Sequence, residues 1–263
     1  MAPSDKTNTN ELRNVENSAL ADDPASLNRL GIWYVNGENV AKDVRKGVVY
    51  IRRAAELGHI GAQFNMANLY NHGVDIPQEE AERCAERAAK AGDVHAQFLL
   101  GSWLQTRSPA AAANWLEQSA RKGHARAQLM IGEMYLRGQG VPRDNKLAKF
   151  WLAHAIEAGD AEAQRLGYAR PSQRHLQRSK EDSLKKMVLN GSGAAALTYA
   201  KLLWQYLEFD EAIAMYLLAA EGGRGEAMAM LSDLYRRGVA VNQDQALADD
   251  WLIKSVDAEN FSQ

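Results

Sequence analysis

The chain has 263 residues, of which 46% are hydrophobic, so it is long enough to bury a substantial core. Its 31 Lys and Arg residues nearly balance 33 Asp and Glu residues, which leaves no overall field to recruit nucleic acid or an anionic membrane. Cys84 is the single cysteine and cannot form an internal disulfide, which favours a reducing compartment, the cytoplasm by default.

The N-terminal segment, residues 1–21, is rich in Asn, Thr and Ser. We expect it to be disordered or to form a short helical arm, with one helix over residues 10–20. It lacks the basic and then apolar pattern of a signal peptide, and the longest apolar run, residues 212–220, is far too short to cross a membrane. We therefore expect no membrane insertion.

From residue 26 onward a common pattern recurs, which indicates a repeat architecture. Seven units begin at a small residue: Ser26, Ala62, Ala96, Ala127, Ala163, Ala195 and Ala227. In six of them an apolar residue follows at plus 4, a small residue at plus 5 and an apolar or aromatic residue at plus 8. This spacing places one stripe along a helix, and the small residue predicts close approach of a neighbouring helix.

A second helix is predicted in each unit from a small, a bulky and a small residue on one face, as in Ala148, Trp151 and Ala155. Six of these helices are followed by a glycine suited to a left-handed C-terminal residue: Gly58, Gly92, Gly123, Gly159, Gly191 and Gly223. N-caps are predicted at Asp23 and Ser108, each before a proline, and at Asp144 and Asp244. Fourteen helices result, paired as hairpins.

One hairpin cannot bury both of its faces, so each is expected to pack on the next. The predicted fold is all-α, a right-handed α-solenoid of about seven helix-turn-helix repeats. We expect two subarrays, residues 22–160 and 193–263, on either side of a degenerate repeat at 161–192 that contains a basic elbow.

The unit from Ala125 to Gly159 resembles the Sel-1-like repeat family, a relative of the tetratricopeptide repeats. The matching residues are Ala127-Gln128, Ile131-Gly132, Tyr135, Gly138, Gly140-Val141, Asp144, Ala148, Trp151, Ala155 and Gly159. The resemblance covers about residues 22–258 and is weakest over 96–123 and 163–191. It implies a binding protein, either an adaptor or, as in some bacterial members, an inhibitor or regulator of secreted proteins. It implies no catalytic residue and no cofactor.

Other motifs have structural interpretations that are favoured over chemical ones. Gly138-Gln139-Gly140 joins two predicted helices, whereas a phosphate-binding loop follows a strand and contains a third glycine. The six histidines lack metal-ligand spacing, so solvated or packing roles are expected and no metal site is predicted. Cys84 takes the bulky core slot that Trp115, Trp151 and Trp251 occupy in other units, which favours a core thiol over a nucleophile. Most of the six tryptophans are likewise expected in the core.

A partner-binding surface is predicted on the first helices, which in tetratricopeptide-like stacks line the concave side. Positions plus 3 and plus 6 should point away from the packing stripe: Arg29, Ile32, Asn65, Asn68, Leu99, Ser102, Met130, Glu133, Thr198, Lys201, Met230 and Asp233. Apolar side chains among amides and charges are typical of a protein-binding surface. We expect a protein partner, no nucleic acid, and an undetermined oligomeric state.

The interval 165–186 is locally basic and breaks the repeat pattern. It is predicted either as a solvated connector between the two subarrays or as a site for an acidic partner segment, with Arg170, Arg174 and Arg178 as candidate contacts.

Three function classes follow. The leading hypothesis is a non-enzymatic scaffold or adaptor in a bacterial-type cytoplasm that binds a polypeptide along the concave surface. The alternative is an immunity or inhibitor protein that neutralises one dedicated secreted toxin. An enzyme would need converging titratable groups, whereas the residues in register are Ala, Gly, Leu, Trp and Tyr.

Overall fold

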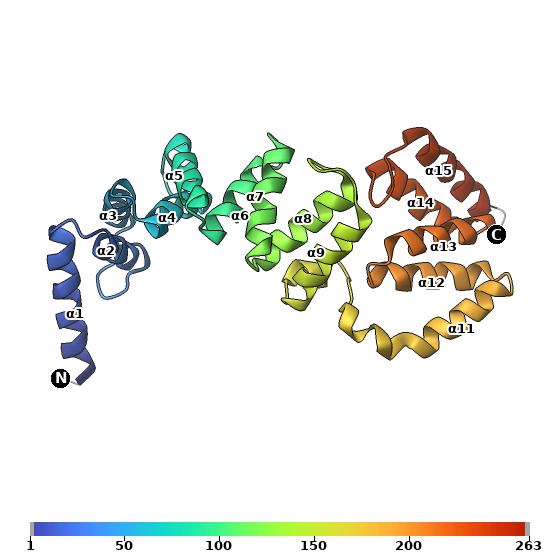
Figure 1. The fold of residues 1–263 in the computed structure, drawn as a ribbon, viewed down its shortest axis with the longest axis horizontal. Helices are drawn as coiled ribbons and strands as arrows, with labels where there is room; N and C mark the ends of the chain where they lie inside the picture. Colours follow the sequence, from blue (N-terminus) through green and yellow to red (C-terminus); the bar gives the residue numbers. More distant parts are fainter. Residues whose placement is uncertain (1–2, 261–263) are drawn as a thin grey trace. The chain divides into compact units, whose positions relative to one another are not determined.

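The computed structural model describes residues 3–260, and within that range the regular secondary structure is entirely helical. This confirms the predicted all-α fold of tandem helix pairs (Figure 1). The chain divides into two compact units, Met1–Leu104 and Gln105–Gln263. The predicted subarray boundaries at residues 160 and 192 fall inside the second unit. Among the described helices, none is long and apolar enough to cross a membrane.

The first unit contains six helices. They are α1 (Pro3–Leu20), α2 (Pro24–Asn36), α3 (Val44–Glu56), α4 (Ile60–Asn71), α5 (Gln78–Lys90) and α6 (Val94–Leu104). Helix α1 covers the segment for which the sequence predicted disorder or a short helix, and residues 1 and 2 lie outside the described residues. Val15 and Ala19 of α1 are buried in the same apolar cluster as Leu27 and Leu30 of α2.

The second unit contains the remaining helices. They are α7 (Pro109–Arg121), α8 (Ala125–Arg137), α9 (Asn145–Glu157), α10 (Ala161–Arg165), the 3₁₀ helix η1 (Pro171–Gln177), α11 (Arg178–Leu189), α12 (Gly193–Gln205), α13 (Phe209–Glu221), α14 (Gly225–Arg237) and α15 (Gln245–Asn260). Consecutive helices pair as predicted, most extensively α8 with α9, α12 with α13 and α14 with α15.

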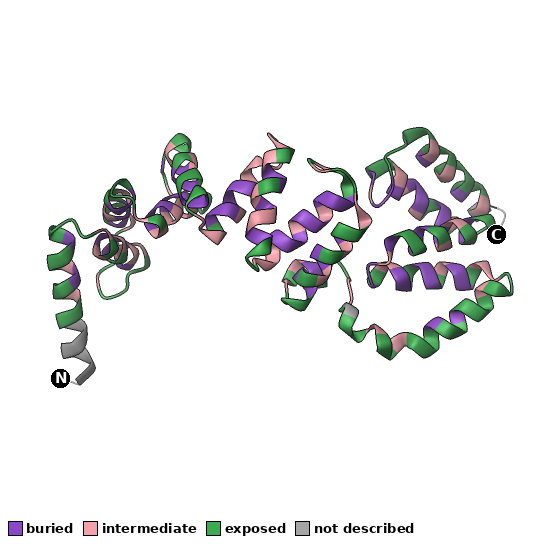
Figure 2. Ribbon diagram, viewed as in Figure 1, coloured by how far each residue is buried: buried purple, intermediate pink, exposed green. Residues whose placement is uncertain are grey.

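Small residues allow the paired helices to approach closely, as the plus-5 position predicted. A Cβ atom on Gly31 of α2 would lie 2.8 Å from the carbonyl oxygen of Gly47 in α3. In the second unit, a Cβ atom on Gly132 of α8 would lie 2.8 Å from Cγ of Leu152 in α9. Most helices consequently carry a buried stripe opposite an exposed one, whereas most of α11 is exposed (Figure 2).

The junctions between units combine a helix stop with a helix start. All six predicted glycines have positive φ, as a left-handed C-terminal residue requires. The next residue caps the following helix with its side chain at five of them: His59, Asp93, His124, Asp160 and Ser192. The two histidines accept through Nδ1, at 3.0 Å from the Ala62 nitrogen and 3.2 Å from the Ala127 nitrogen. Their role is therefore helix capping, which the sequence analysis did not predict.

Two other predictions are corrected. Asp23, Asp144 and Asp244 accept backbone N–H groups as predicted, but the Ser108 side chain makes no capping hydrogen bond. Of the tryptophans assigned to the core slot, Trp151 is buried, whereas Trp115 and Trp251 are half-buried. Trp33 is also buried.

The second unit is not a simple stack in which each hairpin touches only the next. The backbone nitrogen of Ala240, in the turn after α14, donates to the Leu136 carbonyl at the end of α8 (2.9 Å). Asn145 Nδ2, at the start of α9, donates to the Ala240 carbonyl (3.0 Å), and Lys149 Nζ lies 2.7 Å from Glu208 Oε2. The fourth repeat thus contacts the sixth and seventh directly. Helix α10 has only five residues, so it does not fill the place of a full first helix between them.

Candidate functional site

Two pockets gather first-helix residues that the register predicted for partner binding. In the first unit, a pocket of about 210 Å³ lies between α2, α3 and α4. Its lining residues are Ile32, Val35, Asn36, Ile51, Asn65, Asn68 and Leu69. Asn65 Nδ2 donates to Asn28 Oδ1 at 2.9 Å, so amides and aliphatic side chains share this surface. Three of the predicted residues, Ile32, Asn65 and Asn68, therefore meet here.

The second pocket, which we call the α8–α14 pocket, has a volume of about 280 Å³ and lies within the second unit. It is lined by Glu133, Leu136 and Arg137 of α8, Met230, Asp233, Leu234 and Arg237 of α14, Trp204 of α12, and Leu166, Tyr168 and Val239 from connecting segments. The predicted residues Glu133, Met230 and Asp233 come together here. They are brought together because the fourth and seventh repeats are in direct contact.

Each of the helices α8 and α14 contributes an ion pair to this pocket. Arg237 Nη1 donates to Asp233 Oδ2 at 2.9 Å, whereas Arg137 Nη1 lies 3.7 Å from Glu133 Oε2. Tyr168 is held beside them because the Ala169 nitrogen donates to the Gln205 carbonyl (2.8 Å) and the Tyr168 ring meets Phe209 edge-on. Burial raises the pKa of Tyr168 to about 12, so its phenol stays protonated at neutral pH.

Other predicted contact residues lie outside these two pockets. Arg29 is ion-paired with Glu11 of α1 and stacks over Trp33, and Lys201 Nζ lies 2.5 Å from Glu226 Oε1. The Ser102 and Thr198 hydroxyls donate to backbone carbonyls of their own helices. Met130 is half-buried. The register therefore predicted side-chain direction for these residues without bringing them to a common site.

Leu99 is a correction. It was predicted to point away from the packing stripe, but it is buried, 6% exposed, with Ala67 of α4 and Ala85 of α5. Helix α6 is apolar around most of its circumference, so its plus-3 position packs inward.

Arg174 of the basic elbow has ion-pair partners within the chain. Its guanidinium binds Glu181, with Nε donating to Oε1 at 2.9 Å, and also binds Glu208 at the start of α13. These hydrogen bonds raise the pKa of Arg174 and hold η1 against α11 and α13. Arg170 and Arg178 are exposed. A polar pocket of about 410 Å³ lies beside them, lined by Ser172, Arg174, His175, Arg178 and Glu181.

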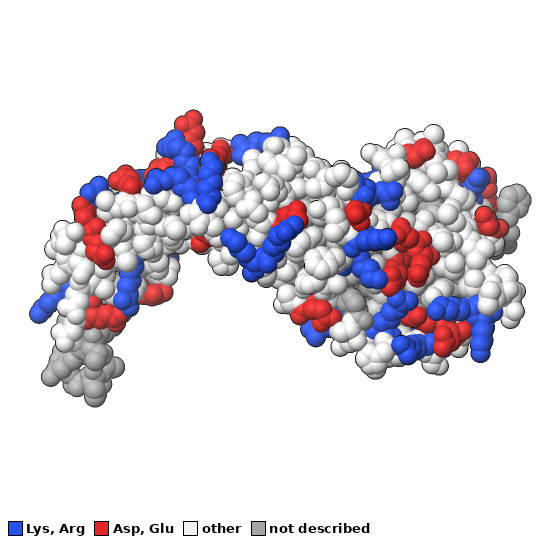
Figure 3. Space-filling view, in the orientation of Figure 1, with Lys and Arg blue, Asp and Glu red and all other residues white. Residues whose placement is uncertain are grey.

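Catalytic and metal chemistry find little support among the described residues. No group of three or more His, Cys, Asp or Glu side chains could hold a metal ion within the described range. Cys84 is buried, and burial raises the pKa of its thiol, which disfavours the nucleophilic thiolate. On the faces drawn in Figure 3, positive and negative side chains are interspersed on each unit, as the balanced composition predicts.

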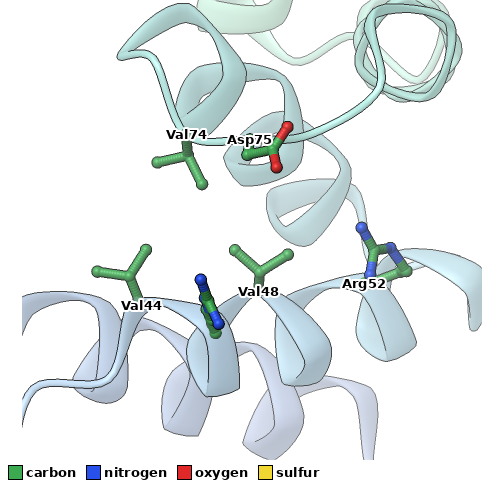
Figure 4. Close-up of a pocket in the computed structure, with 6 residues that line it drawn as sticks. Val44, Val48, Arg52, Val74 and Asp75 are labelled. Carbon is green, nitrogen blue, oxygen red and sulfur yellow. The ribbon is translucent and has the colours of Figure 1, made fainter.

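A further pocket, of about 520 Å³, lies in the first unit where the sequence predicted no site. Figure 4 shows Val44, Val48 and Arg52 of α3 facing Val74 and Asp75 of the loop after α4. Asp75 follows Tyr70 in the second repeat at the same offset at which Gly140 follows Tyr135 in the fourth repeat. This loop therefore differs in composition from the turn that packs tightly in the fourth repeat.

Sequence reasoning missed several residues of the α8–α14 pocket. Arg137 and Arg237 follow Glu133 and Asp233 by one helical turn, a spacing that predicts ion pairs on the same face. Leu166 and Tyr168 lie in the degenerate repeat, outside any register, so no periodic signal could place them in the pocket.

Comparisons with known proteins agree with this architecture. A chitin synthase regulatory factor of Schizosaccharomyces pombe is 33% identical over 121 residues, which is 44% of this chain and 19% of that protein. The chain thus spans about a fifth of the length of this curated relative.

Two solved structures share the fold. A Sel1 repeat protein from Oxalobacter formigenes is 26% identical, with a TM-score of 0.51 over 97% of this chain and 80% of that chain. A protective antigen of uropathogenic Escherichia coli with an SLR fold is 23% identical, with a TM-score of 0.57 over 95% of this chain and 56% of that one.

The Sel1 repeat profile matches residues 24–59, 60–93, 94–124, 125–160, 209–223 and 225–260, which is well over half of the sequence. The fifth repeat, where the first helix is only five residues long, is outside these matches. The chain belongs to the Sel1 repeat family.

Proposed function

We propose that this protein is a non-enzymatic cytoplasmic scaffold or adaptor that holds a partner polypeptide against the first helices of its repeats. Sel1 repeat proteins are generally protein-interaction scaffolds, and a curated relative is named as a regulatory factor. The compartment follows from the lone cysteine and is part of the proposal.

The observation that carries the proposal is the composition of the two first-helix pockets. Each combines apolar lining with polar groups at its margin: amides in the first unit, and two ion pairs in the second. An apolar centre with a polar rim is typical of a surface that anchors side chains of another protein. Neither pocket contains an activated nucleophile, which favours binding over hydrolysis.

Site-specific photo-crosslinking in native lysate tests the proposal. A photoreactive residue would replace Asn68 in the first-unit pocket or Met230 in the α8–α14 pocket, with exposed Val49 of α3 and Asp249 of α15 as outward controls. We expect the two pocket positions to crosslink to the same set of partner polypeptides and the controls not to. Crosslinks confined to the control positions would place the binding surface elsewhere.

Charge reversal provides a second readout on the same surface. Glu133→Lys combined with Asp233→Lys should weaken capture of the crosslinked partner, because it places two long side chains in the α8–α14 pocket and removes the ion pairs that position Arg137 and Arg237. A single dominant partner in these experiments would favour an inhibitor, whereas several partners would favour a scaffold.

A further inference from the structure

The α8–α14 pocket has a chemical asymmetry that restricts what it can bind. Its wall is largely apolar, formed by Leu136, Leu166, Trp204, Met230, Leu234 and Val239. The polar groups at the pocket are two arginines, two carboxylates and one phenol. The polar groups that lack partners within the protein therefore determine which ligand can bind.

Hydrogen-bond donors are left over at this pocket. The Arg137 side chain makes no hydrogen bond within the described part of the chain, because its 3.7 Å separation from Glu133 is too long for one. Arg237 donates from Nη1 to Asp233, which leaves most of its five N–H donors available. The Tyr168 hydroxyl likewise has no hydrogen-bond partner among residues 3–260. The carboxylate of Asp233, in contrast, is already engaged.

The three donor groups lie close enough to act together. Arg137, Arg237 and Tyr168 line one pocket of about 280 Å³, so a single guest can reach all three. Because burial raises the pKa of Tyr168 to about 12, the phenol carries its proton at neutral pH and can donate it to an acceptor. The donors of Arg137, Arg237 and Tyr168 outnumber the acceptors of Glu133 and Asp233, so a guest that supplies a further acceptor would satisfy them.

We propose that the α8–α14 pocket binds the C-terminal residue of a partner polypeptide, with its apolar side chain against the apolar wall and its carboxylate on Arg137, Arg237 and the Tyr168 hydroxyl. This inference rests on the proposed function and names the part of the partner that enters the second unit. A C-terminal residue places an apolar side chain and a carboxylate on one Cα atom, which matches a pocket of about 280 Å³. An internal Asp or Glu would bring the carboxylate without an apolar side chain.

The test uses the full chain and three pools of fluorescently labelled hexapeptides in anisotropy titrations. The first pool ends in Leu, Ile or Phe with a free carboxylate, the second has the same sequences as C-terminal amides, and the third is amidated with an internal Glu. We expect the free-acid pool to bind about tenfold or more tightly than either amidated pool, since a hydrogen bond to a charged group contributes about 1.5–3 kcal/mol.

Variants separate the pocket from nonspecific attraction. Arg137→Gln with Arg237→Gln should abolish the preference for the free acid, and Tyr168→Phe should reduce it while the circular dichroism spectrum is unchanged. Arg121→Gln on α7, outside the pocket, should bind like the parent protein. Equal affinity for acid and amide, a preference that survives the double arginine variant, or no binding to any pool would each overturn the proposal.

The two proposals fail in different ways. If no peptide pool binds while Asn68 and Met230 still crosslink to a partner, the C-terminal assignment is wrong and the scaffold function stands. If the free-acid preference is present but crosslinks in lysate come only from Val49 and Asp249, the first-helix surface is not the main partner site.

Discussion

The turns of the fourth and seventh repeats have the same sequence pattern but different neighbours. Gly138-Gln139-Gly140 follows α8, and Gly238-Val239-Ala240 follows α14 one hundred positions later. Gly140 and Ala240 both have positive φ. A Cβ atom on Gly140 would lie 2.3 Å from the Pro109 carbonyl at the start of α7. Ala240 already carries that Cβ atom, and its carbonyl accepts hydrogen bonds from Asn145 and Arg143 of the fourth repeat.

This difference separates two ways of joining repeats. At Gly140, where the fourth repeat meets the third, backbone packs against backbone and only glycine fits. Where the seventh repeat meets the fourth across the shortened fifth repeat, the Ala240 nitrogen donates to the Leu136 carbonyl, and polar side chains of the fourth repeat bind Ala240 and Asn242. Gly140 is thus required by its close backbone neighbour, whereas the same position of the seventh repeat accommodates alanine.

The largest effect is expected from Gly140→Ala. The added Cβ atom would overlap the Pro109 backbone, in addition to the strain of a left-handed alanine, so the second unit should lose about 3 kcal/mol of unfolding free energy. Urea denaturation measures the change. Gly159→Ala is the matched control, because its φ of +81° is similar but no atom lies within 4 Å, and it should lose only about 1 kcal/mol. Equal losses for the two variants would show that backbone strain alone explains the glycine.

Arg174→Ala should have the next largest effect, because it removes the ion pair that holds the fifth repeat against its neighbours. Glu181 is buried at 7% side-chain exposure, so it would be left without its partner. Since Arg174 is itself 30% exposed, we expect a loss of about 2 kcal/mol, below the range for a fully buried pair. Hydrogen exchange should increase in η1 and α11. In a double-mutant cycle, Glu181→Gln should cost little more once Arg174 is absent, and full additivity would contradict the coupling.

A smaller effect, a gain in stability, is expected at the junction that leads into the seventh repeat. His124 caps α8 in the fourth repeat, whereas Arg224 precedes α14 and provides no side-chain cap. Arg224→Asp adds an acceptor and a negative charge at the helix N-terminus, so thermal unfolding should show stabilisation by about 1 kcal/mol. His124→Ala, the reciprocal change, should destabilise by a similar amount. If Arg224→Asp is neutral, the start of α14 is held by tertiary packing rather than by capping.

The smallest effect is expected from Ala240→Gly. Glycine relieves the left-handed strain at φ +59° but adds freedom to the unfolded chain, so the net gain should be about 0.5 kcal/mol. Paired denaturation curves with Gly140→Ala would then show opposite signs at equivalent positions. A loss of stability in Ala240→Gly would mean that the buried methyl group packs in the turn.

The sequence predicted residues of the candidate site only where the repeat pattern fixes their position on a helix. Ile32, Asn65, Asn68, Glu133, Met230 and Asp233 were placed by their offset from the small residue, and the pockets gather them. Leu99 had the same offset and is buried, because the apolar surroundings of α6 decide its direction. The repeat pattern assigns no position to Tyr168, since this residue follows the shortened α10.

The sequence by itself determined the period, the pairing of helices, the glycine stops and the caps at Asp23, Asp144 and Asp244, because these depend on residues within one repeat or its neighbour. The tertiary structure decided the contact of the fourth repeat with the sixth and seventh, the ion pairs of Arg174, and the residues that close the α8–α14 pocket. Contacts between non-adjacent repeats have no periodic signature. They depend on how a five-residue helix leaves space for more distant segments to meet.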